Sequence, residues 1–231
     1  MHPTKSSKAG VKAKRSREHI LNTALSLFQK RGFDKTTMRA IASECNIALG
    51  ASYYHFSCKE ELVLAFYERS LNEFEQRAKI IFSETADFEK RLLRLVASKL
   101  VELKPYKKFL FALTRSALDP RSPISPFTGT TGDIRQRVIS IFKECVESSD
   151  LKVPKALRQR LALLLWIYHM ALIFLWLHDE TPGEAKTSRI TERSAKLVFG
   201  LLKLANLPFT GAILKPVYEM IDEFLPDGSA A

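Results

Sequence analysis

The chain has 231 residues, 46% of them hydrophobic, and a formal net charge of +11. This size leaves room for a small domain and a larger domain with its own core. Only 9 glycines occur and no alternating β-branched runs are present, so a β-rich fold is excluded and an all-α protein is expected. No apolar stretch follows the basic N-terminus, so a secretory signal is not expected either.

The N-terminal part divides into a tail and a helix. Residues 1–14 carry four lysines and almost no large apolar side chain, so we predict a disordered basic tail. Residues 15–31 have apolar side chains at spacings of three and four, which predicts an amphipathic helix. Gly32 stands where a helix ends in the left-handed conformation. The apolar positions are Ile20, Leu21, Ala24, Leu25 and Phe28.

Two short helices and the start of a third are predicted next. Thr37 is the expected N-cap of a helix over residues 38–45, and Asn46 is the expected turn residue. A second helix over residues 49–55 returns the chain to the core at Phe56. Ser57 and Glu60 have the spacing of a capping box that opens a longer helix at Cys58. Residues 15–62 therefore have the helix lengths and the short turn of a helix-turn-helix domain.

The remaining chain, residues 63–225, is predicted to form one larger helical domain. Pro105 should end a helix because proline does not fit a helix interior. Residues 119–132 are rich in Pro, Ser and Gly, which predicts a loop, and residues 226–231 are expected to be a flexible tail. The predicted helices cover residues 58–83, 88–104, 106–118, 133–148, 154–178, 184–205 and 212–224.

The helix-turn-helix segment resembles the N-terminal domain of TetR-family transcriptional regulators. The likeness covers about the first 60–70 residues and includes spacings as well as residue types. Asn46-Ile47-Ala48 replaces the family's usual Gly-Val-Ser turn, so the next helix lacks its usual serine N-cap. The matching residues are Gly32-Phe33, Thr36-Thr37, Ile41-Ala42, Gly50, Tyr53-Tyr54-His55-Phe56 and Lys59-Glu60-Glu61-Leu62.

The resemblance implies how this segment binds double-stranded DNA. The helix over residues 49–55 would enter the major groove with Tyr53 facing the bases, while flanking hydroxyl groups and cations hold phosphates. Arg39 is the candidate for a bidentate guanine contact, and Ala51 for a thymine methyl. A role of Tyr53 in core packing and a solvated Lys59 are the structural alternatives. The full set of candidate DNA-binding residues is Thr36, Thr37, Arg39, Leu49, Gly50, Ala51, Ser52, Tyr53, Tyr54, His55 and Lys59.

The charge distribution agrees with a nucleic-acid partner. Residues 1–60 contain 11 basic and 4 acidic side chains and so carry +7 of the net +11. Positive charge concentrated on one domain is the electrostatic signature of a nucleic-acid binder. The tail over residues 1–14 is either a basic arm that follows the DNA backbone or the minor groove, or a solubilising extension.

Residues 161–177, LALLLWIYHMALIFLWL, are the most apolar part of the chain. Their length is at the lower limit for a membrane span, but Tyr168 and His169 interrupt them and the mean hydropathy of the chain is −0.09. We therefore expect no membrane association and a helix buried on both sides. The resemblance implies that the last two long helices pair with those of a second copy, giving a homodimer that binds a palindromic operator.

The resemblance also implies a repressor that a small-molecule effector releases from DNA. Aromatic, polar and soft residues are the candidates for an effector pocket in the C-terminal domain, although such side chains more often form plain core, and a hydrophobic or aromatic effector is expected. No bound cofactor is predicted. The candidate ligand-binding residues are Phe109, Phe111, Phe127, Trp166, His169, Met170 and Phe174.

Other classes of function have weaker support. The sequence contains no Gly-x-Ser-x-Gly motif and no glycine-rich phosphate loop, so an enzyme is not expected. Cys45, Cys58 and Cys145 have no C-x-x-C spacing, which predicts neither a disulfide framework nor a metal site and fits a bacterial cytoplasm. A ligand-independent regulator, or one that senses redox state through Cys58 near a helix N-terminus, is the alternative.

Overall fold

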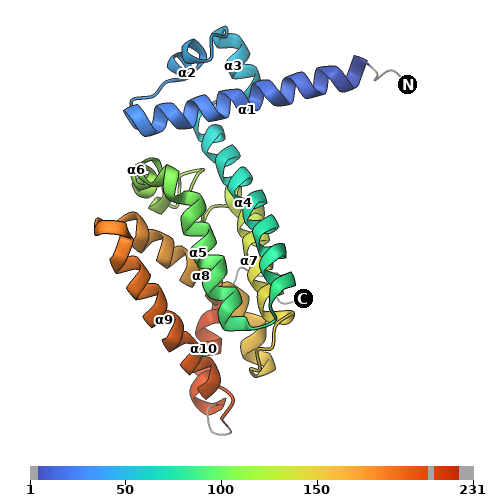
Figure 1. Cartoon of the computed structure of the whole chain (residues 1–231), viewed down its shortest axis with the longest axis vertical. Helices are drawn as coiled ribbons and strands as arrows, with labels where there is room; N and C mark the ends of the chain where they lie inside the picture. Colours follow the sequence, from blue (N-terminus) through green and yellow to red (C-terminus); the bar gives the residue numbers. More distant parts are fainter. Residues whose placement is uncertain (1–4, 208–210, 224–231) are drawn as a thin grey trace. The chain divides into compact units, whose positions relative to one another are not determined.

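The computed structural model describes residues 5–207 and 211–223, and every regular element in those two ranges is helical (Figure 1). The chain forms two compact units. We call Met1–Asn72 together with Leu103–Arg135 the head unit, and Glu73–Glu102 together with Gln136–Ala231 the body unit. The division falls inside the helix that follows the helix-turn-helix segment, so the head unit contains more than the domain predicted over residues 15–62.

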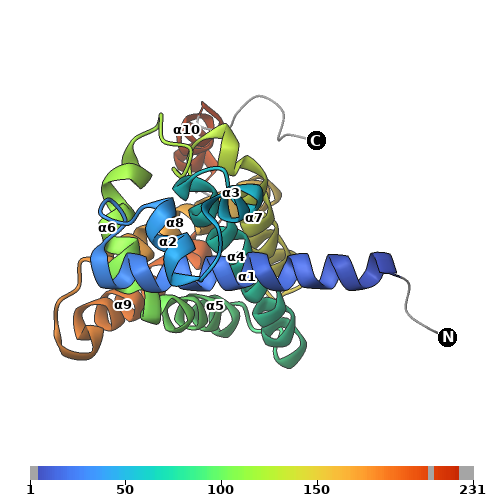
Figure 2. The same cartoon turned by 90° about the horizontal axis from the view of Figure 1, so that it is seen from above.

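The head unit begins with α1 (Lys5–Arg31), α2 (Met38–Glu44), α3 (Leu49–His55) and the first part of α4 (Lys59–Glu84). Helix α1 runs past α2 and α3 in both views (Figures 1 and 2). The prediction of a disordered tail is therefore wrong for residues 5–14, while residues 1–4 lie outside the described part. Residues 5–14 are helical because alanine and lysine favour helix and because each residue added to an existing helix gains a hydrogen bond.

The apolar stripe of α1 packs as its spacing predicts. Ile20, Ala24 and Phe28 are at most 1% exposed. Phe28 also stacks on Phe109 with ring centroids 5.2 Å apart, and Phe66 of α4 meets Phe109 edge-on. Phe109 lies on α6 (Lys107–Leu118), which explains why α6 belongs to the head unit.

Local turn signals in the head unit are confirmed. Gly32 has a φ of 84° and Asn46 a φ of 53°, both in the left-handed region. The hydroxyl oxygen of Thr37 accepts a hydrogen bond from the backbone N–H of Ala40 at 3.1 Å, as expected of an N-cap. Ala48, the N-cap residue of α3, supplies no side-chain acceptor. The chain therefore turns as predicted, and α3 begins without a side-chain cap.

The start of α4 differs from the predicted capping box. Ser57 bonds to Glu61 rather than Glu60: its backbone N–H and its hydroxyl donate to the two carboxylate oxygens at 2.7 and 2.6 Å. These hydrogen bonds hold the pKa of Glu61 below its ordinary value, because they stabilise the ionised carboxylate. The cap still closes the helix start, with a partner one residue further along.

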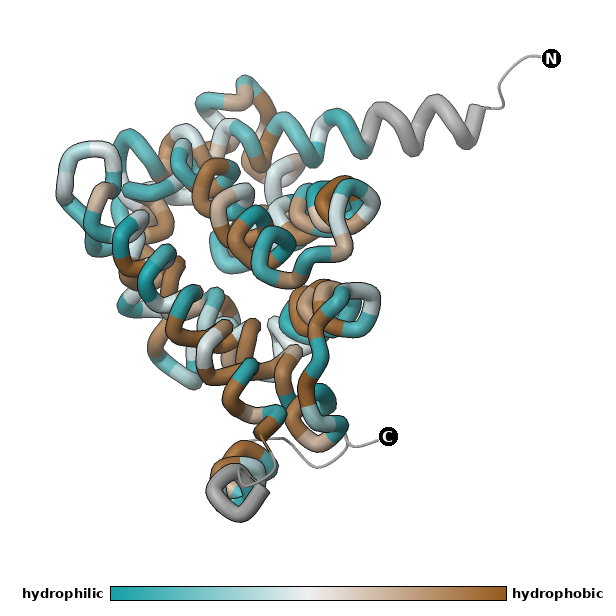
Figure 3. Tube along the Cα trace, turned by 60° about the horizontal axis from the view of Figure 1, so that its bottom comes forward, coloured by the Kyte–Doolittle hydropathy of each residue, from teal (hydrophilic) through white to brown (hydrophobic). Residues whose placement is uncertain are grey.

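The later helices follow the predicted order. Helix α5 (Phe88–Leu103) gives way to a short 3₁₀ helix, η1 (Lys104–Tyr106), that contains Pro105, and another, η2 (Gly129–Thr131), interrupts the predicted loop. Hydrophobic and hydrophilic residues alternate along the helices, as expected for amphipathic packing (Figure 3). The predicted tail over residues 226–231 lies outside the described part. The remaining elements are α7 (Gly132–Glu147), α8 (Lys155–Leu177), η3 (Pro182–Glu184), α9 (Ala185–Leu204) and α10 (Gly211–Glu223).

Helix α8 is the one helix in the described ranges that is long and apolar enough to cross a membrane, judged by length and composition alone. Within the body unit, Leu165, Leu172 and Trp176 are at most 2% exposed. Ile167 and Phe174 are 47% and 41% exposed. The helix therefore has one side in the core of the unit and another apolar side that the chain itself leaves open.

Candidate nucleic-acid interface

The exposed surface of α3 is the most distinctive feature of the head unit. Tyr54 is 84% exposed and Tyr53 is 49% exposed, and Gly50 and Ala51 are also exposed. A Cβ placed on Gly50 would meet no atom within 4 Å, so no neighbour within the chain requires a glycine there. Two large aromatic side chains that face solvent on one short helix indicate a surface that meets a partner.

Helix α2 presents two further groups near its start. Arg39 is exposed, and its guanidinium can grip a carboxylate, phosphate or guanine edge with two parallel hydrogen bonds. The Thr37 hydroxyl is exposed and uses its oxygen to cap the helix, which leaves its proton to donate to an anion. The short helix α2 thus places a cation and a hydroxyl donor on the surface of the head unit.

Two predicted contact residues are structural instead. Thr36 is 0% exposed, its hydroxyl donates to the Gly32 carbonyl at 2.8 Å, and its backbone N–H donates to Phe33. Ser52 is also 0% exposed, and its hydroxyl donates to the Leu49 carbonyl at 2.8 Å. The prediction that these side chains contact DNA is therefore wrong, because burial and internal hydrogen bonds occupy both hydroxyl groups.

Lys59 has a role inside the head that the sequence did not indicate. Its ammonium group donates to the Phe33 carbonyl at 2.8 Å and lies 4.4 Å from the centroid of the Phe33 ring. It therefore ties the start of α4 to the loop between α1 and α2. Lys59 thus positions the start of α4 within the head unit, and its predicted phosphate contact stays a prediction.

Two arginines also brace the head, and neither was predicted. Arg17 of α1 places its guanidinium 4.6 Å from the centroid of the Phe56 ring, directly after α3. Arg69 of α4 donates to Asn22 of α1 at 2.6 Å and to the Tyr106 hydroxyl at 3.2 Å. Both contacts join segments distant in sequence. Only spatial proximity reveals them, since no local motif marks the pairs.

The residues predicted to bind a ligand are divided between the two units. In the head unit, Phe109 is fully buried and stacks on Phe28, whereas Phe111 and Phe127 are 48% and 56% exposed. In the body unit, Trp166 and His169 are buried, Met170 is half-buried and Phe174 is exposed. The ligand-binding role of these residues stays a prediction.

His169 is the most unusual of these residues. Its ring stacks on Phe74 with centroids 5.5 Å apart, and Phe142 lies at 5.4 Å. Within the described part of the chain, its Nδ1 atom finds no hydrogen-bond partner. Burial, together with the nearby charge of Lys99, lowers the pKa of His169 to about 3. The imidazole is therefore neutral at pH 7 and offers an unused polar atom inside the body unit.

Lys99 is buried beside this aromatic group. Burial lowers its pKa, and Glu102, with its carboxylate 3.0 Å from the ammonium nitrogen, partly reverses that shift. The ammonium nitrogen also lies 5.0 Å from the centroid of the Phe74 ring. The body unit thus holds a charged pair next to a neutral imidazole, a combination that helical spacing alone does not predict.

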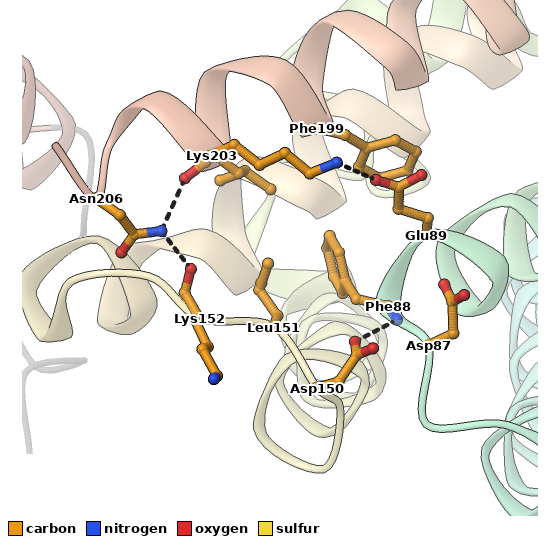
Figure 4. Close-up of a pocket in the computed structure, with 10 residues that line it drawn as sticks. Asp87, Phe88, Glu89, Asp150, Leu151, Lys152, Phe199, Lys203 and Asn206 are labelled. Atoms are coloured by element: carbon orange, nitrogen blue, oxygen red, sulfur yellow. Dashed lines mark hydrogen bonds and ion pairs between the residues drawn. The ribbon is translucent and has the colours of Figure 1, made fainter.

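A pocket of about 410 Å³ lies elsewhere in the body unit, at the start of α5, the α7–α8 connection and the end of α9 (Figure 4). The backbone N–H of Phe88 donates to Asp150 at 3.0 Å, and Lys203 pairs with Glu89 at 3.5 Å. The volume of this pocket is within the range of small-molecule sites. None of the predicted ligand-binding residues lines the pocket. The apolar lining is Phe88, Leu151, Phe199 and Leu202, and the polar lining is Asp87, Glu89, Asp150, Lys152, Lys203 and Asn206.

The cysteines offer no support for redox control. Cys45 and Cys145 are buried and Cys58 is half-buried, and all three are free thiols. Burial raises the pKa of Cys145 to about 12, which removes the thiolate needed for reaction at pH 7.

Comparison with known families identifies two regions. Residues 20–66 match a family model described as "Bacterial regulatory proteins, tetR family". Residues 91–223 match one described as "Tetracyclin repressor-like, C-terminal domain". The second match alone covers more than half of the chain, and the first contains α2 and α3 with their exposed side chains.

Curated relatives are regulators with the same type of DNA-binding domain. The chain is 28% identical over 176 residues to the probable HTH-type transcriptional regulator ArpR of Pseudomonas putida, covering 71% of this chain and 81% of that protein. It is 25% identical over 186 residues to AcrR of Shigella flexneri, covering 74% and 82%. With YerO of Bacillus subtilis it shares 32% over 108 residues, which span 46% of this chain and only 37% of that protein.

Solved structures show the same fold at low sequence identity. The TetR transcriptional regulator from Nitrosomonas europaea aligns with a TM-score of 0.61 at 18% identity, over 78% of this chain and 96% of that one. A TetR-family transcriptional regulator from Streptomyces coelicolor aligns with a TM-score of 0.60 at 18% identity, over 93% and 91%.

Proposed function

The chain belongs to the TetR family of bacterial transcriptional regulators, and we propose that it is a homodimeric cytoplasmic repressor that a small hydrophobic effector releases from a palindromic operator. Regulators of this family bind DNA through the helix-turn-helix domain. The observation that carries the proposal is the exposed surface of α3, where Tyr53 and Tyr54 face solvent. The named relatives are transcriptional regulators, which supports a binding function.

In the proposed complex, α3 enters the major groove and α2 crosses the backbone. Tyr53 and Ala51 meet base edges, and the absence of a side chain on Gly50 allows close approach. Arg39 grips a guanine, while Thr37 and Tyr54 donate hydroxyl hydrogen bonds to phosphates. Leu49 and His55 complete the surface at the two ends of α3.

A second copy of the chain would cover the open apolar surface of α8 and α9. Ile167 and Phe174 are exposed on α8, and Leu197, Leu201 and Leu204 are 64%, 56% and 54% exposed on α9. The α9 residues recur at spacings of four and three, so they form one stripe. Pairing of these surfaces around a two-fold axis would bury them and present two heads to half-sites about one helical turn apart.

The effector would bind in the body unit and weaken DNA binding by favouring a conformation that fits the operator poorly. A 100-fold loss of DNA affinity corresponds to about 2.7 kcal/mol of coupling. Two places support such a site: the 410 Å³ pocket and the neutral His169 with its unused Nδ1 atom. Trp166 and Met170 on α8 remain the proposed aromatic and soft contacts near the second place, whereas Phe174 lies on the open surface of the helix.

Selection of bound sequences from random duplex DNA tests the DNA-reading role. The selected sites should be palindromic. The Arg39→Ala variant should bind the selected site about 10- to 100-fold more weakly while keeping its affinity for random DNA. Arg121→Ala is the matched control, because Arg121 is an exposed arginine of the head unit paired with Asp119. Equal losses on selected and random DNA would overturn the base contact of Arg39.

A compound screen for release of the selected DNA tests the effector. Leu202→Trp fills the pocket at α9, and His169→Phe removes the unused ring nitrogen while keeping a buried aromatic ring. Release should be lost in one variant and retained in the other, which locates the site. If no hydrophobic or aromatic compound releases the protein from DNA, effector control is wrong and the DNA-binding function stands by itself.

A further inference from the structure

Helix α1 extends well beyond the part that packs in the head. It begins at Lys5, whereas Ile20 is the first buried residue among its described side chains. Figures 1 and 2 both show this part of α1 projecting past α2 and α3 within the head unit. We call residues 5–17 the arm. None of its described side chains, residues 14–17, is buried, and the last of them, Arg17, contacts Phe56 of the head unit.

The arm is uniformly cationic. Residues 5–17 contain six lysines and arginines and no acidic residue. Lys5, Lys8, Lys12 and Arg15 recur at spacings of three and four, so these positions share one side of the helix. At the end of the arm near the head, Lys14 and Arg15 are exposed. Like charges at these spacings repel each other along a helix, and the arm supplies no carboxylate to offset them.

Duplex DNA is the partner that fits this surface. Its backbone carries one negative charge per about 1.7 Å of axis, and binding of a cationic segment releases counterions. Val11 is the only large apolar residue in the arm, so the arm lacks the apolar face that a membrane-surface helix inserts into lipid. The arm is also the first part of α1, whose later part packs against α2 in the head unit.

We propose that the arm binds the phosphates of duplex DNA that flanks the half-site read by α3. This inference rests on the proposed docking of the head. Arg15 and Lys5 are ten positions apart, so the cationic side spans about 15 Å of helix, equivalent to four or five base pairs at about 3.4 Å each. Lysines bind phosphates without reading bases, so the added affinity depends on flank length and salt but not on flank sequence.

The test compares two duplexes with the full-length protein. One contains only the selected operator core, and the other adds about ten base pairs of unrelated sequence on each side. The charge variant is Lys5→Gln/Lys8→Gln/Lys12→Gln. The matched control is Lys79→Gln/Lys155→Gln/Lys186→Gln, which removes the same charge from exposed lysines of the body unit. The thermal unfolding midpoints of both variants should equal that of wild type.

Wild type should bind the flanked duplex more tightly than the core duplex. The arm variant should lose at least about tenfold in affinity for the flanked duplex, and its slope of log affinity against log salt should fall by about 2–3 per protomer. It should bind the core duplex like wild type. The control variant should retain the preference for flanks.

Three outcomes would overturn the proposal. If the arm variant binds the flanked duplex with the affinity and salt slope of wild type, the arm makes no contact there. An equal loss on both duplexes would place the three lysines in the head's own contacts. Retained DNA binding together with lost binding to phosphatidylserine vesicles would assign the arm to a membrane. Failure of wild type to prefer the core sequence would instead overturn the function of the head.

Discussion

The head unit and the body unit differ in their buried polar groups: among the described residues, the buried charged side chains Arg91, Lys99 and Asp179 all belong to the body unit. In the head, Thr37 and Ser57 close helix starts over three or four residues of sequence. In the body, Arg91 reaches across 57 residues to the Ser148 hydroxyl at 2.8 Å. Local caps can be predicted from the sequence because their spacing is fixed. The hydrogen-bond partner of a buried side chain far along the chain is determined only by how the helices pack.

The difference has consequences for stability and for function. Capping groups in the head lie at the surface, where each contributes about 1 kcal/mol. Buried polar groups in the body contribute more, because an unpaired buried donor or acceptor loses its hydration without replacement. Mutations should therefore damage the body mainly through folding, while the exposed side chains of the head can change DNA binding without unfolding the protein.

The largest effect is expected at Arg91, which is 4% exposed. Its guanidinium donates to the Thr85 carbonyl at 2.5 Å and the Phe82 carbonyl at 3.0 Å, in addition to Ser148. Arg91→Met leaves these acceptors unpaired and should lower the free energy of unfolding by at least about 3 kcal/mol. Urea denaturation followed by circular dichroism measures the change.

Arg94→Met is the control for this prediction. Arg94 is 46% exposed and pairs with Glu84 at the surface, so its loss should cost less than about 1 kcal/mol. Equal effects of the two substitutions would contradict the view that buried long-range hydrogen bonds stabilise the body more than its surface ion pairs.

Asp179 makes the stability of the body unit depend on pH. Its carboxylate accepts hydrogen bonds from the backbone N–H and hydroxyl groups of Thr181 and Thr187 at 2.6 to 2.9 Å. These bonds hold its pKa well below the ordinary value. The stabilisation is fully present above the unfolded pKa of about 3.9 and is lost as the pH falls towards the lower folded pKa.

Asp179→Asn should therefore lower the urea midpoint at pH 7 and make it less dependent on pH below about 4. Glu180→Gln is the control, since Glu180 is its exposed neighbour. The difference between wild type and the Asn variant should shrink with acidity. A constant difference from pH 7 to pH 3 would show that the carboxylate charge has no role in joining α8 to α9.

Substitutions at the adjacent residues Thr36 and Thr37 should separate effects on folding from effects on DNA binding in the head unit. Thr36→Val removes a buried hydroxyl that donates to Gly32, and Thr37→Val removes an exposed N-cap. Each should cost about 1 kcal/mol of stability. Only Thr37→Val should also weaken DNA binding, measured by fluorescence anisotropy at a temperature where both variants are folded. Loss of DNA affinity in Thr36→Val would contradict its placement as a core residue.

The same pair of residues shows what sequence reasoning could and could not reach. Gly32, Thr37 and Asn46 were predictable because each acts on neighbours within a few residues. Thr36 was misassigned because the path of the chain after Gly32, rather than residue type, decides which hydroxyl is buried. The contact of Lys59 with the Phe33 carbonyl was missed for a related reason, because the two residues lie 26 positions apart.

The body was predictable in outline and not in its polar core. Apolar spacing placed the helices of the body unit to within a few residues. No spacing rule indicated that His169 stacks on Phe74 beside a tilted Phe142 ring, or that Arg91 is buried. The prediction of a disordered tail was wrong for a different reason. The low apolar content of residues 5–14 predicted disorder, but their helix propensity and their continuity with the rest of α1 favour a helix.

The smallest expected effect concerns the uncapped start of α3. Ala48 is exposed, has extended backbone angles of −63° and 143°, and makes no side-chain cap. Ala48→Ser should add an acceptor for the first free N–H groups of the helix and raise the free energy of unfolding by about 0.5–1 kcal/mol. Ala51→Ser, an exposed substitution inside the same helix, should give no such gain, because serine is a poorer helix former than alanine. Thermal unfolding of both variants measures the difference, and an equal response would show that the missing cap does not limit the stability of the reading helix.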